Sequence, residues 1–175
     1  MRKLTFILFV VFVFTYAGHS QEAQIAKYKS MFTVNFIRYI GWPEEATKGN
    51  FVIGVLKDKT VAANLKKLTL GKKFGYQQII IKEFKNINEV TDCQILFVSK
   101  LINYSNKNSE IIKQKLGNKN SLIVTNSEGS TKKGAMINFV IRDNKLKFEI
   151  SSTNASKFGL KFSSSLTSLS NAIIK

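Results

Sequence analysis

The sequence predicts an α/β fold, a three-layer Rossmann-like sandwich with a mostly parallel sheet and a late antiparallel hairpin. Between residues 50 and 126, short apolar runs rich in β-branched residues alternate with segments of helical spacing. This alternation is typical of a parallel sheet covered by helices on both faces. Further along, two alternating runs flank a short turn at Asp143–Asn144, which indicates a hairpin.

The first twenty residues have the layout of a secretory signal peptide. A short basic start is followed by an apolar run at 4–17, and Ala17 and Ser20 offer small residues for cleavage. The run is short for a membrane span, and an uncleaved N-terminal anchor is the alternative. We therefore expect residues 1–20 to be removed and 21–175 to form a single exported domain without a membrane span.

Residues 22–41 are predicted to form the first helix of this domain. Its apolar face, by three- and four-residue spacing, is Ile25, Tyr28, Phe32, Phe36, Tyr39 and Ile40. The only Trp and the only Pro of the chain follow as Trp42 and Pro43. Proline disfavours helical backbone at the preceding residue, so the helix should end near Trp42. The Trp42 ring can then be buried under the first helix, where the next strand begins. The alternative is that the ring is exposed and binds a partner protein.

The rest of the chain supplies the sheet and its covering helices. Strands are predicted at 50–56, 76–84, 94–98 and 121–126, and the hairpin at 135–151. Helices are predicted after the first strand, up to Gly71, and at 108–118, where Gly117 marks the end. The segment 151–173 is predicted to be one Ser-rich helix. Its expected inner face is Leu160, Leu166, Leu169 and Ile173.

Charge argues against one class of partner. Subtracting Arg2 and Lys3 from the 27 basic residues leaves 25 in the mature chain, against 11 acidic ones, for a net charge of +14. The lysines are scattered, and no basic run is interleaved with aromatic residues. We therefore expect no nucleic-acid partner and a solvated surface, with attraction to acidic partners or anionic lipid as the second interpretation.

Residue types that carry chemistry are scarce. The only histidine, His19, lies in the expected signal peptide, which excludes His-based triads and His-ligated metals from the mature chain. No glycine-rich phosphate motif is present, and the Gly/Ser-rich segment 127–134 is interpreted as a loop. Cys93 stands alone, and we interpret it as a small buried hydrophobe, with an intermolecular disulfide as the alternative. We predict no catalytic residue, no metal site, no cofactor and no enzymatic activity.

Several stretches together resemble one known family. "VNFIRYIGWP" at 34–43, "DCQILFVS" at 92–99 and "KKGAMINFV" at 132–140 occur in the same order as in the YfiR-like family of periplasmic regulatory proteins. The resemblance covers residues 22–174. This sequence departs from the family pattern at two points. It keeps only one cysteine, and Ala135 stands where the family has a glycine. The matching residues that we interpret as a structural motif are Asn35, Phe36, Pro43, Cys93, Gly134 and Met136.

The resemblance implies a function as well as a fold. It implies a non-enzymatic repressor that binds the periplasmic sensor domain of an inner-membrane signalling enzyme. That enzyme is typically a diguanylate cyclase, so the protein would control cyclic-di-GMP and biofilm formation. A sensor histidine kinase could equally be the partner. The resemblance also implies a homodimer.

A periplasmic small-ligand-binding protein is the alternative. In parallel sheets, ligands bind at the carboxyl ends of the strands. Polar residues follow the predicted strands at these ends: Lys57, Asp58, Ser99, Lys100, Thr125, Asn126 and Ser127. The candidate partner- or ligand-binding residues are Trp42, Lys57, Asp58, Ser99, Thr125, Asn126 and Ser127.

Overall fold

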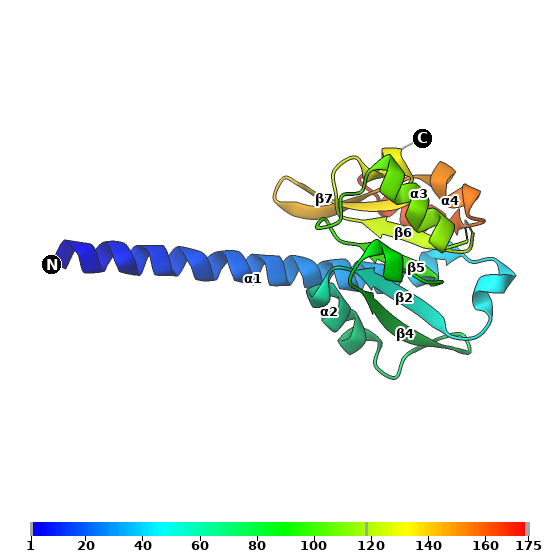
Figure 1. Cartoon of the computed structure of the whole chain (residues 1–175), viewed down its shortest axis with the longest axis horizontal. Coiled ribbons are helices and arrows are strands. Elements are labelled where there is room, and N and C mark those ends of the chain that lie inside the picture. The colour runs from blue at the N-terminus through cyan, green and yellow to red at the C-terminus, as the bar shows by residue number, and fades with distance from the viewer. Residues whose placement is uncertain (1, 118, 174–175) are drawn as a thin grey trace.

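The computed structural model describes the backbone of residues 2–117 and 119–173 and the side chains of residues 21–117 and 119–173. The side chains of the expected signal peptide, and with them the small residues at its cleavage sites, lie outside the described residues. Helix α1 (Arg2–Tyr39) leads into the domain (Figure 1). Among the residues searched, no helix is long and apolar enough to span a membrane.

A mostly parallel sheet forms the centre of the domain. In the described part of the chain its eight strands are ordered β10-β8-β7-β6-β5-β2-β4-β3. The strands are β2 (Phe51–Leu56), β3 (Lys73–Phe74), β4 (Gln77–Phe84), β5 (Ile95–Val98), β6 (Leu122–Thr125), β7 (Ile137–Arg142), β8 (Lys145–Ile150) and β10 (Ala172–Ile173). Strands β4, β2, β5, β6 and β7 are parallel neighbours, and β7–β8 is the antiparallel hairpin. The predicted fold class is confirmed.

The remaining elements cover the sheet or close its ends. The longer helices are α2 (Lys59–Thr69) and α3 (Asn106–Lys115), and the short C-terminal ones are α4 (Ser152–Lys157) and α5 (Ser164–Leu169). Single 3-10 turns occur at η1 (Glu44–Thr47), η2 (Ile87–Glu89) and η3 (Ser130–Lys133). Strand β1 (Ile40–Gly41) pairs antiparallel with β9 (Lys161–Phe162), away from the main sheet.

Connection handedness explains why the sheet is covered on both faces. From β2 the chain passes through α2 to β4, and from β5 it passes through α3 to β6. These two connections run in opposite directions along the sheet. Because such crossovers are right-handed, α2 and α3 lie on opposite faces. Helix α1 packs beside α2, so these two form one outer layer.

Small residues set the packing of α1 against α2. The buried positions on α1 include Ala26, Ser30 and Thr33, and the Ser30 hydroxyl donates to the carbonyls of Ala26 (2.8 Å) and Val61 (3.4 Å). Short side chains let two helices approach closely. The expected apolar face was therefore partly wrong, because Tyr28 is 43% exposed. By helical spacing, Tyr28 lies on the opposite side of α1 from these small residues.

An aromatic cluster fixes α1 on the sheet. The rings of Phe36 and Phe148 meet edge to face at 5.4 Å, and Phe36 stacks on Phe139 at 5.9 Å. Phe32 contacts the same two sheet residues, at 5.7 and 6.2 Å. Aromatic pairs at these distances add roughly 0.5–1.5 kcal/mol each beyond the burial of their area. The cluster holds α1 over the hairpin half of the sheet.

The C-terminal segment corrects a prediction. It does not form one helix: α4 and α5 are separated by β9, and the chain ends with β10 beside β8. Leu160 and Leu166 are buried as expected, but Leu169 is 61% and Ile173 50% exposed. Gly159, with φ +74, lies in the left-handed region and stops α4. The serines cap the two helices, with Ser151 accepting from Asn154 and Ser163 from Leu166.

Candidate functional site

An open groove lies at the carboxyl edge of the parallel strands. Its volume is about 1240 Å³. The residues that follow β2, β4, β5 and β6 form its floor, with Lys57, Lys85, Ser99 and Asn126 as the first at each strand end. Residues of α1 between Glu22 and Lys29 form one wall, and the β7–β8 hairpin forms another.

The groove lies where the strand order reverses. Strands β2 and β5 are neighbours, but the chain leaves β2 towards β4 and leaves β5 towards β6. Loops at such a point diverge and leave a crevice outside the strand ends, where ligands of open α/β sheets bind. The groove is therefore in the position that the fold class favours for a binding site.

Four candidate residues meet in this groove and three do not. Lys57, Asp58, Ser99 and Asn126 line it, together with Lys100. Thr125 and Ser127, on either side of Asn126, do not line it. Trp42 lies at the opposite end of the sheet, because it packs on Phe51, the first residue of β2, and the groove begins after Leu56. Those two ends are about 17 Å apart along an extended strand.

The loop after β2 brings charge to the groove floor. Lys57 has φ +60, so the chain turns sharply at the strand end and its amide donates to the Phe84 carbonyl at 2.9 Å. The Asp58 carboxylate then caps α2 by accepting from the Val61 amide at 3.0 Å. A cap of this kind stabilises a helix by about 1 kcal/mol. The role of Asp58 as a helix cap is therefore enough to explain an aspartate at this position.

The loop after β5 is held by its own backbone and by Ser99. The buried Ser99 hydroxyl accepts from the Leu101 amide at 3.2 Å, and the Ser99 amide donates to the Leu56 carbonyl at 3.1 Å. Leu101 is left 66% exposed at the groove rim. Ser99 shapes the groove, with its hydroxyl engaged inside the loop.

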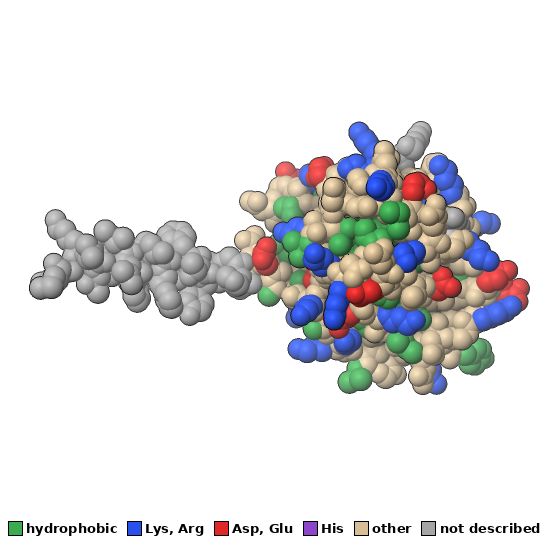
Figure 2. All heavy atoms as spheres, viewed as in Figure 1, with side chains coloured by type: hydrophobic (Ala, Val, Ile, Leu, Met, Phe, Trp, Pro, Cys, Tyr) green, Lys and Arg blue, Asp and Glu red, His purple; other side chains and the backbone are tan. Residues whose placement is uncertain are grey.

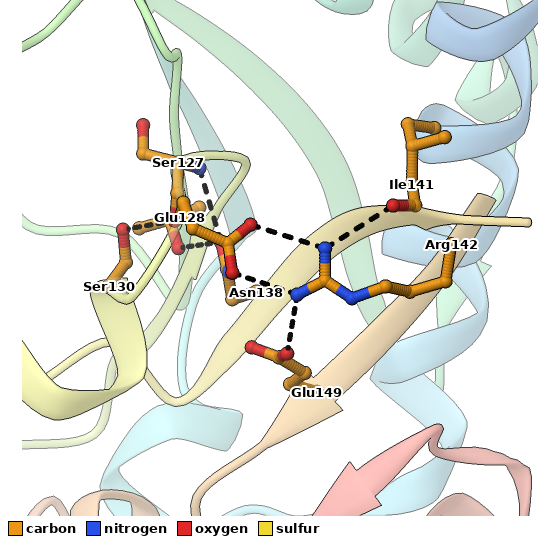
Figure 3. A network of polar contacts seen from close by, with 8 residues as sticks. Ser127, Glu128, Ser130, Asn138, Ile141, Arg142 and Glu149 are labelled. Atoms are coloured by element: carbon orange, nitrogen blue, oxygen red, sulfur yellow. Dashed lines mark hydrogen bonds and ion pairs between the residues drawn. The ribbon is translucent and has the colours of Figure 1, made fainter. Parts of the chain in front are cut away.

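A polar network fixes the loop after β6. The buried Asn138 side-chain oxygen accepts from the Thr125 hydroxyl at 2.8 Å and from the Ser127 amide at 3.2 Å. Figure 3 shows that this network continues to the hairpin, where Arg142 contacts the carboxylates of Glu128, in the loop, and of Glu149. The Arg142 Nη2 atom lies 2.8 Å from Glu128 and 3.3 Å from Glu149. Thr125 and Ser127 therefore position the loop, and the hairpin is tied to the groove rim.

The hydrogen bond from Arg142 also lowers the pKa of the Glu128 carboxyl. Both groups are exposed, so the pair is screened by solvent and contributes little to stability.

Apolar side chains that sequence reasoning did not select form much of the lining. Phe84 lies at the end of β4, Phe139 and Ile141 lie on β7, Leu146 lies on β8, and Ile25 lies on α1. Phe84 and Lys85 end a parallel strand, so the rule that selected the other loops could have found them. The α1 and hairpin residues have no such signal, because only the tertiary fold places them there.

Lys29 stands out among the basic residues of the groove. It is half-buried on the α1 wall. Burial lowers the pKa of its ammonium group and nearby Lys100 adds to this, while the charges of Asp58 and Glu22 act in the opposite direction. Within the described residues, no carboxylate lies within 4.0 Å of it. Lys29 therefore brings a positive charge, partly removed from water, to an apolar wall.

One amide in the groove lacks a partner. The side-chain oxygen of Asn126 is enclosed and accepts no hydrogen bond from the described residues. The buried side-chain nitrogen of Asn138 and the hydroxyl of Tyr104 are likewise unpaired within that part of the chain. An enclosed polar atom without a partner costs roughly 1–3 kcal/mol. Of these three residues, only Asn126 lines the groove.

Trp42 and Pro43 connect the end of α1 to the sheet. The helix ends at Tyr39, three residues before Trp42 and earlier than expected, because Ile40–Gly41 pairs with β9. The Trp42 indole N–H donates to the Ile37 carbonyl at 2.9 Å, and the ring meets Phe51 edge to face at 5.1 Å. The ring is half-buried. These contacts give Trp42 a structural role in the fold. A role for Trp42 in binding a partner stays a prediction.

The other motif residues have structural surroundings. Phe36 and Met136 are buried at 1% and 0% exposure, whereas Asn35 is exposed on α1. Gly134 has φ +100 and ends η3, where a glycine is favoured. Cys93 is a buried free thiol, as expected, and burial raises its pKa to about 12. A thiol this enclosed has no route to an intermolecular disulfide in the folded state.

Charge is dispersed over the surface. Figure 2 shows Lys and Arg side chains spread over the viewed face, with acidic and apolar groups between them. The molecule therefore presents mixed charge on this face, with a basic excess overall.

The structure defines an α/β domain with an open groove at one edge of its sheet. Within the described side chains, no cluster of His, Cys, Asp and Glu has the arrangement of a metal site. Residues 26–171 match the YfiR/HmsC-like family, and the chain belongs to that family. A search of curated proteins found no match to the chain. Membership of this family indicates a periplasmic regulator of a signalling system.

Proposed function

We propose that this chain is a non-enzymatic repressor that binds the periplasmic sensor domain of an inner-membrane signalling enzyme. The enzyme would be a diguanylate cyclase, so that release of the repressor raises cyclic-di-GMP and promotes biofilm formation. The observation that supports this proposal best is the family match, because residues 26–171 span most of the domain described here.

Repression of this kind needs binding alone. A protein that prefers the inactive conformation of its partner shifts the partner's population towards that conformation, by as much as its two affinities differ. No catalytic group is required, which is compatible with a chain that has no histidine after residue 20. The net positive charge favours an acidic patch on the partner, because opposite charges speed the encounter.

Export and self-association are part of the same proposal. Residues 1–20 would act as a cleaved signal peptide that delivers the domain to the periplasm. Exposed apolar residues on α1 offer a contact surface for a homodimer or for the sensor domain: Tyr28 is 43% and Met31 is 40% exposed, one turn apart. Trp42 is a second candidate contact, through the part of its ring that is not covered by Phe51.

A small-ligand-binding function is the second candidate. The groove favours it, because it lies at the carboxyl ends of the parallel strands and gathers Lys57, Asp58, Ser99 and Asn126. The two functions are compatible in one molecule, since a ligand in the groove could control binding to the sensor domain.

Partner binding can be tested with purified components. The protein recovered from the periplasm is titrated with the sensor domain of the membrane protein encoded beside it, at low and high salt. We expect binding, with slower association at high salt. Met31→Glu should weaken binding, whereas the control Leu169→Glu, at an exposed position on α5, should not. Absence of binding at both salt concentrations would contradict the proposal.

A further inference from the structure

The groove is lined by apolar side chains together with several charged ones. Phe84, Phe139, Ile141 and Leu146 come from three strands, and Ile25 and Ala26 from α1. Apolar surface left open to water in a concave site is the usual lining of a pocket for an organic ligand. Its volume of about 1240 Å³ is sufficient for a small molecule together with water.

The acidic groups of the groove are already engaged. Glu22 pairs with Lys100 at 3.7 Å, Glu83 with Lys66 at 2.6 Å and Glu128 with Arg142 at 2.8 Å. The fourth, Asp58, caps α2. The other lysines of the lining have no carboxylate within 4.0 Å of their ammonium groups in the described residues: Lys29, Lys57, Lys59 and Lys85. Asp58 keeps its negative charge, so four unpaired lysines against one unpaired carboxylate leave an excess of positive charge at the groove.

Lys29 is the one of these lysines best placed to anchor a ligand. It is half-buried on α1, one turn from the apolar Ile25 and Ala26, whereas Lys57, Lys59 and Lys85 are exposed. A charge that is partly desolvated interacts more strongly with an opposite charge than one in open water.

We propose that the groove binds a small amphipathic anion, an apolar chain or ring with one carboxylate, whose charge pairs with Lys29. The apolar body would lie against Phe84, Phe139 and Leu146, and the exposed lysines would favour entry of the anion. A single negative charge fits better than a doubly charged phosphate, because the cost of removing an ion from water rises steeply with its charge. The proposal rests on the groove and not on the membrane partner, so it can fail while the regulator proposal stands.

The test compares two probes of equal chain length and opposite charge. The protein recovered from the periplasm is titrated with decanoate and with decylammonium in a calorimeter. We expect decanoate to bind about tenfold more tightly than decylammonium, because the unpaired charges of the groove are lysines. Lys29→Met keeps the apolar stem and removes the charge, so it should weaken decanoate binding by about tenfold.

A matched control separates the groove from general basicity. Lys27→Met removes the same charge from an exposed position of α1 that does not line the groove, and it should leave decanoate binding unchanged. If Lys29→Met does not fold, the Lys57→Gln, Lys59→Gln double variant takes its place and should weaken decanoate binding severalfold. The proposal is overturned if neither probe binds, if both bind equally, or if the groove and control variants behave alike.

Discussion

At the scale of single residues, Trp42 joins the end of α1 to the first buried strand. Its N–H bonds the Ile37 carbonyl and its ring packs on Phe51. We expect Trp42→Ala to lower the free energy of unfolding by about 2–4 kcal/mol, through lost packing and a lost hydrogen bond. Trp42→Phe keeps an aromatic ring and should cost about 1 kcal/mol. Urea denaturation measures both values.

The same variants separate the two interpretations of Trp42. If Trp42→Ala keeps its stability but no longer binds the sensor domain, the residue is a partner contact and the fold-anchor interpretation is wrong. If stability falls and the folded fraction still binds, the ring serves the fold.

Cys93 gives a prediction on pH. Burial raises the pKa of its thiol from 9.0 to about 12, so the folded state holds the proton more tightly than the unfolded chain. The stabilisation is full below pH 9 and is lost as the pH rises towards 12. By about pH 10.5 the loss should reach about 2 kcal/mol.

The measurement compares the slope of stability against pH with that of Cys93→Ala. Removing the thiol should make the slope shallower above pH 9, whatever the variant does to stability at neutral pH. Equal slopes would show that the thiol is not enclosed in the folded protein.

At the scale of elements, β2 is packed too closely to accept a larger side chain at Gly54. A Cβ atom there would lie 2.7 Å from the Phe84 ring and 3.0 Å from the Cys93 sulfur. Gly54→Ala should therefore lower the free energy of unfolding by about 1–3 kcal/mol. Gly41→Ala in β1 is the control, because its Cβ would meet the nearest atom at 3.4 Å. Similar melting temperatures for the two variants would contradict this packing.

The elements that the sequence predicts well are those with a strong local pattern. The runs at β2, β5 and β6 are buried on both faces and read as continuous apolar stretches. The hairpin shows alternation and a turn at Asp143–Asn144, both with positive φ. The two-residue strands β3, β9 and β10 carry no periodicity and depend on neighbours distant in sequence. For that reason the sequence did not reveal that the segment 151–173 forms two short helices and two short strands in place of one helix.

Part of the groove follows from the topology and part does not. Once the sheet is taken as parallel, the residues after its strands must share one edge, which selects Lys57, Ser99 and Asn126. The wall that carries Lys29 depends on how far α1 extends past the sheet, and the opposite wall on the reach of the hairpin. Those distances are set by tertiary packing, such as that of Phe36 on Phe148.

At the scale of the whole molecule, the first prediction concerns export. Cleavage after Ala17 or after Ser20 should place the mature N-terminus between Gly18 and Gln21. Helix α1 would then begin at the groove wall, because Glu22 already lines the groove. N-terminal sequencing of protein from the periplasmic fraction gives the answer. A chain that begins at Met1 and remains with the membrane would show that the segment is an anchor.

The central claim is that the protein represses a membrane signalling enzyme by binding it. The most direct measurement is the cyclic-di-GMP level in four strains: wild type, a strain without this protein, a strain without the neighbouring membrane enzyme, and a strain without both. Removing the repressor should raise cyclic-di-GMP only where the enzyme is present, because the active conformation is then released. An unchanged level in the strain without this protein, or a rise that persists when the enzyme is also removed, would contradict the claim.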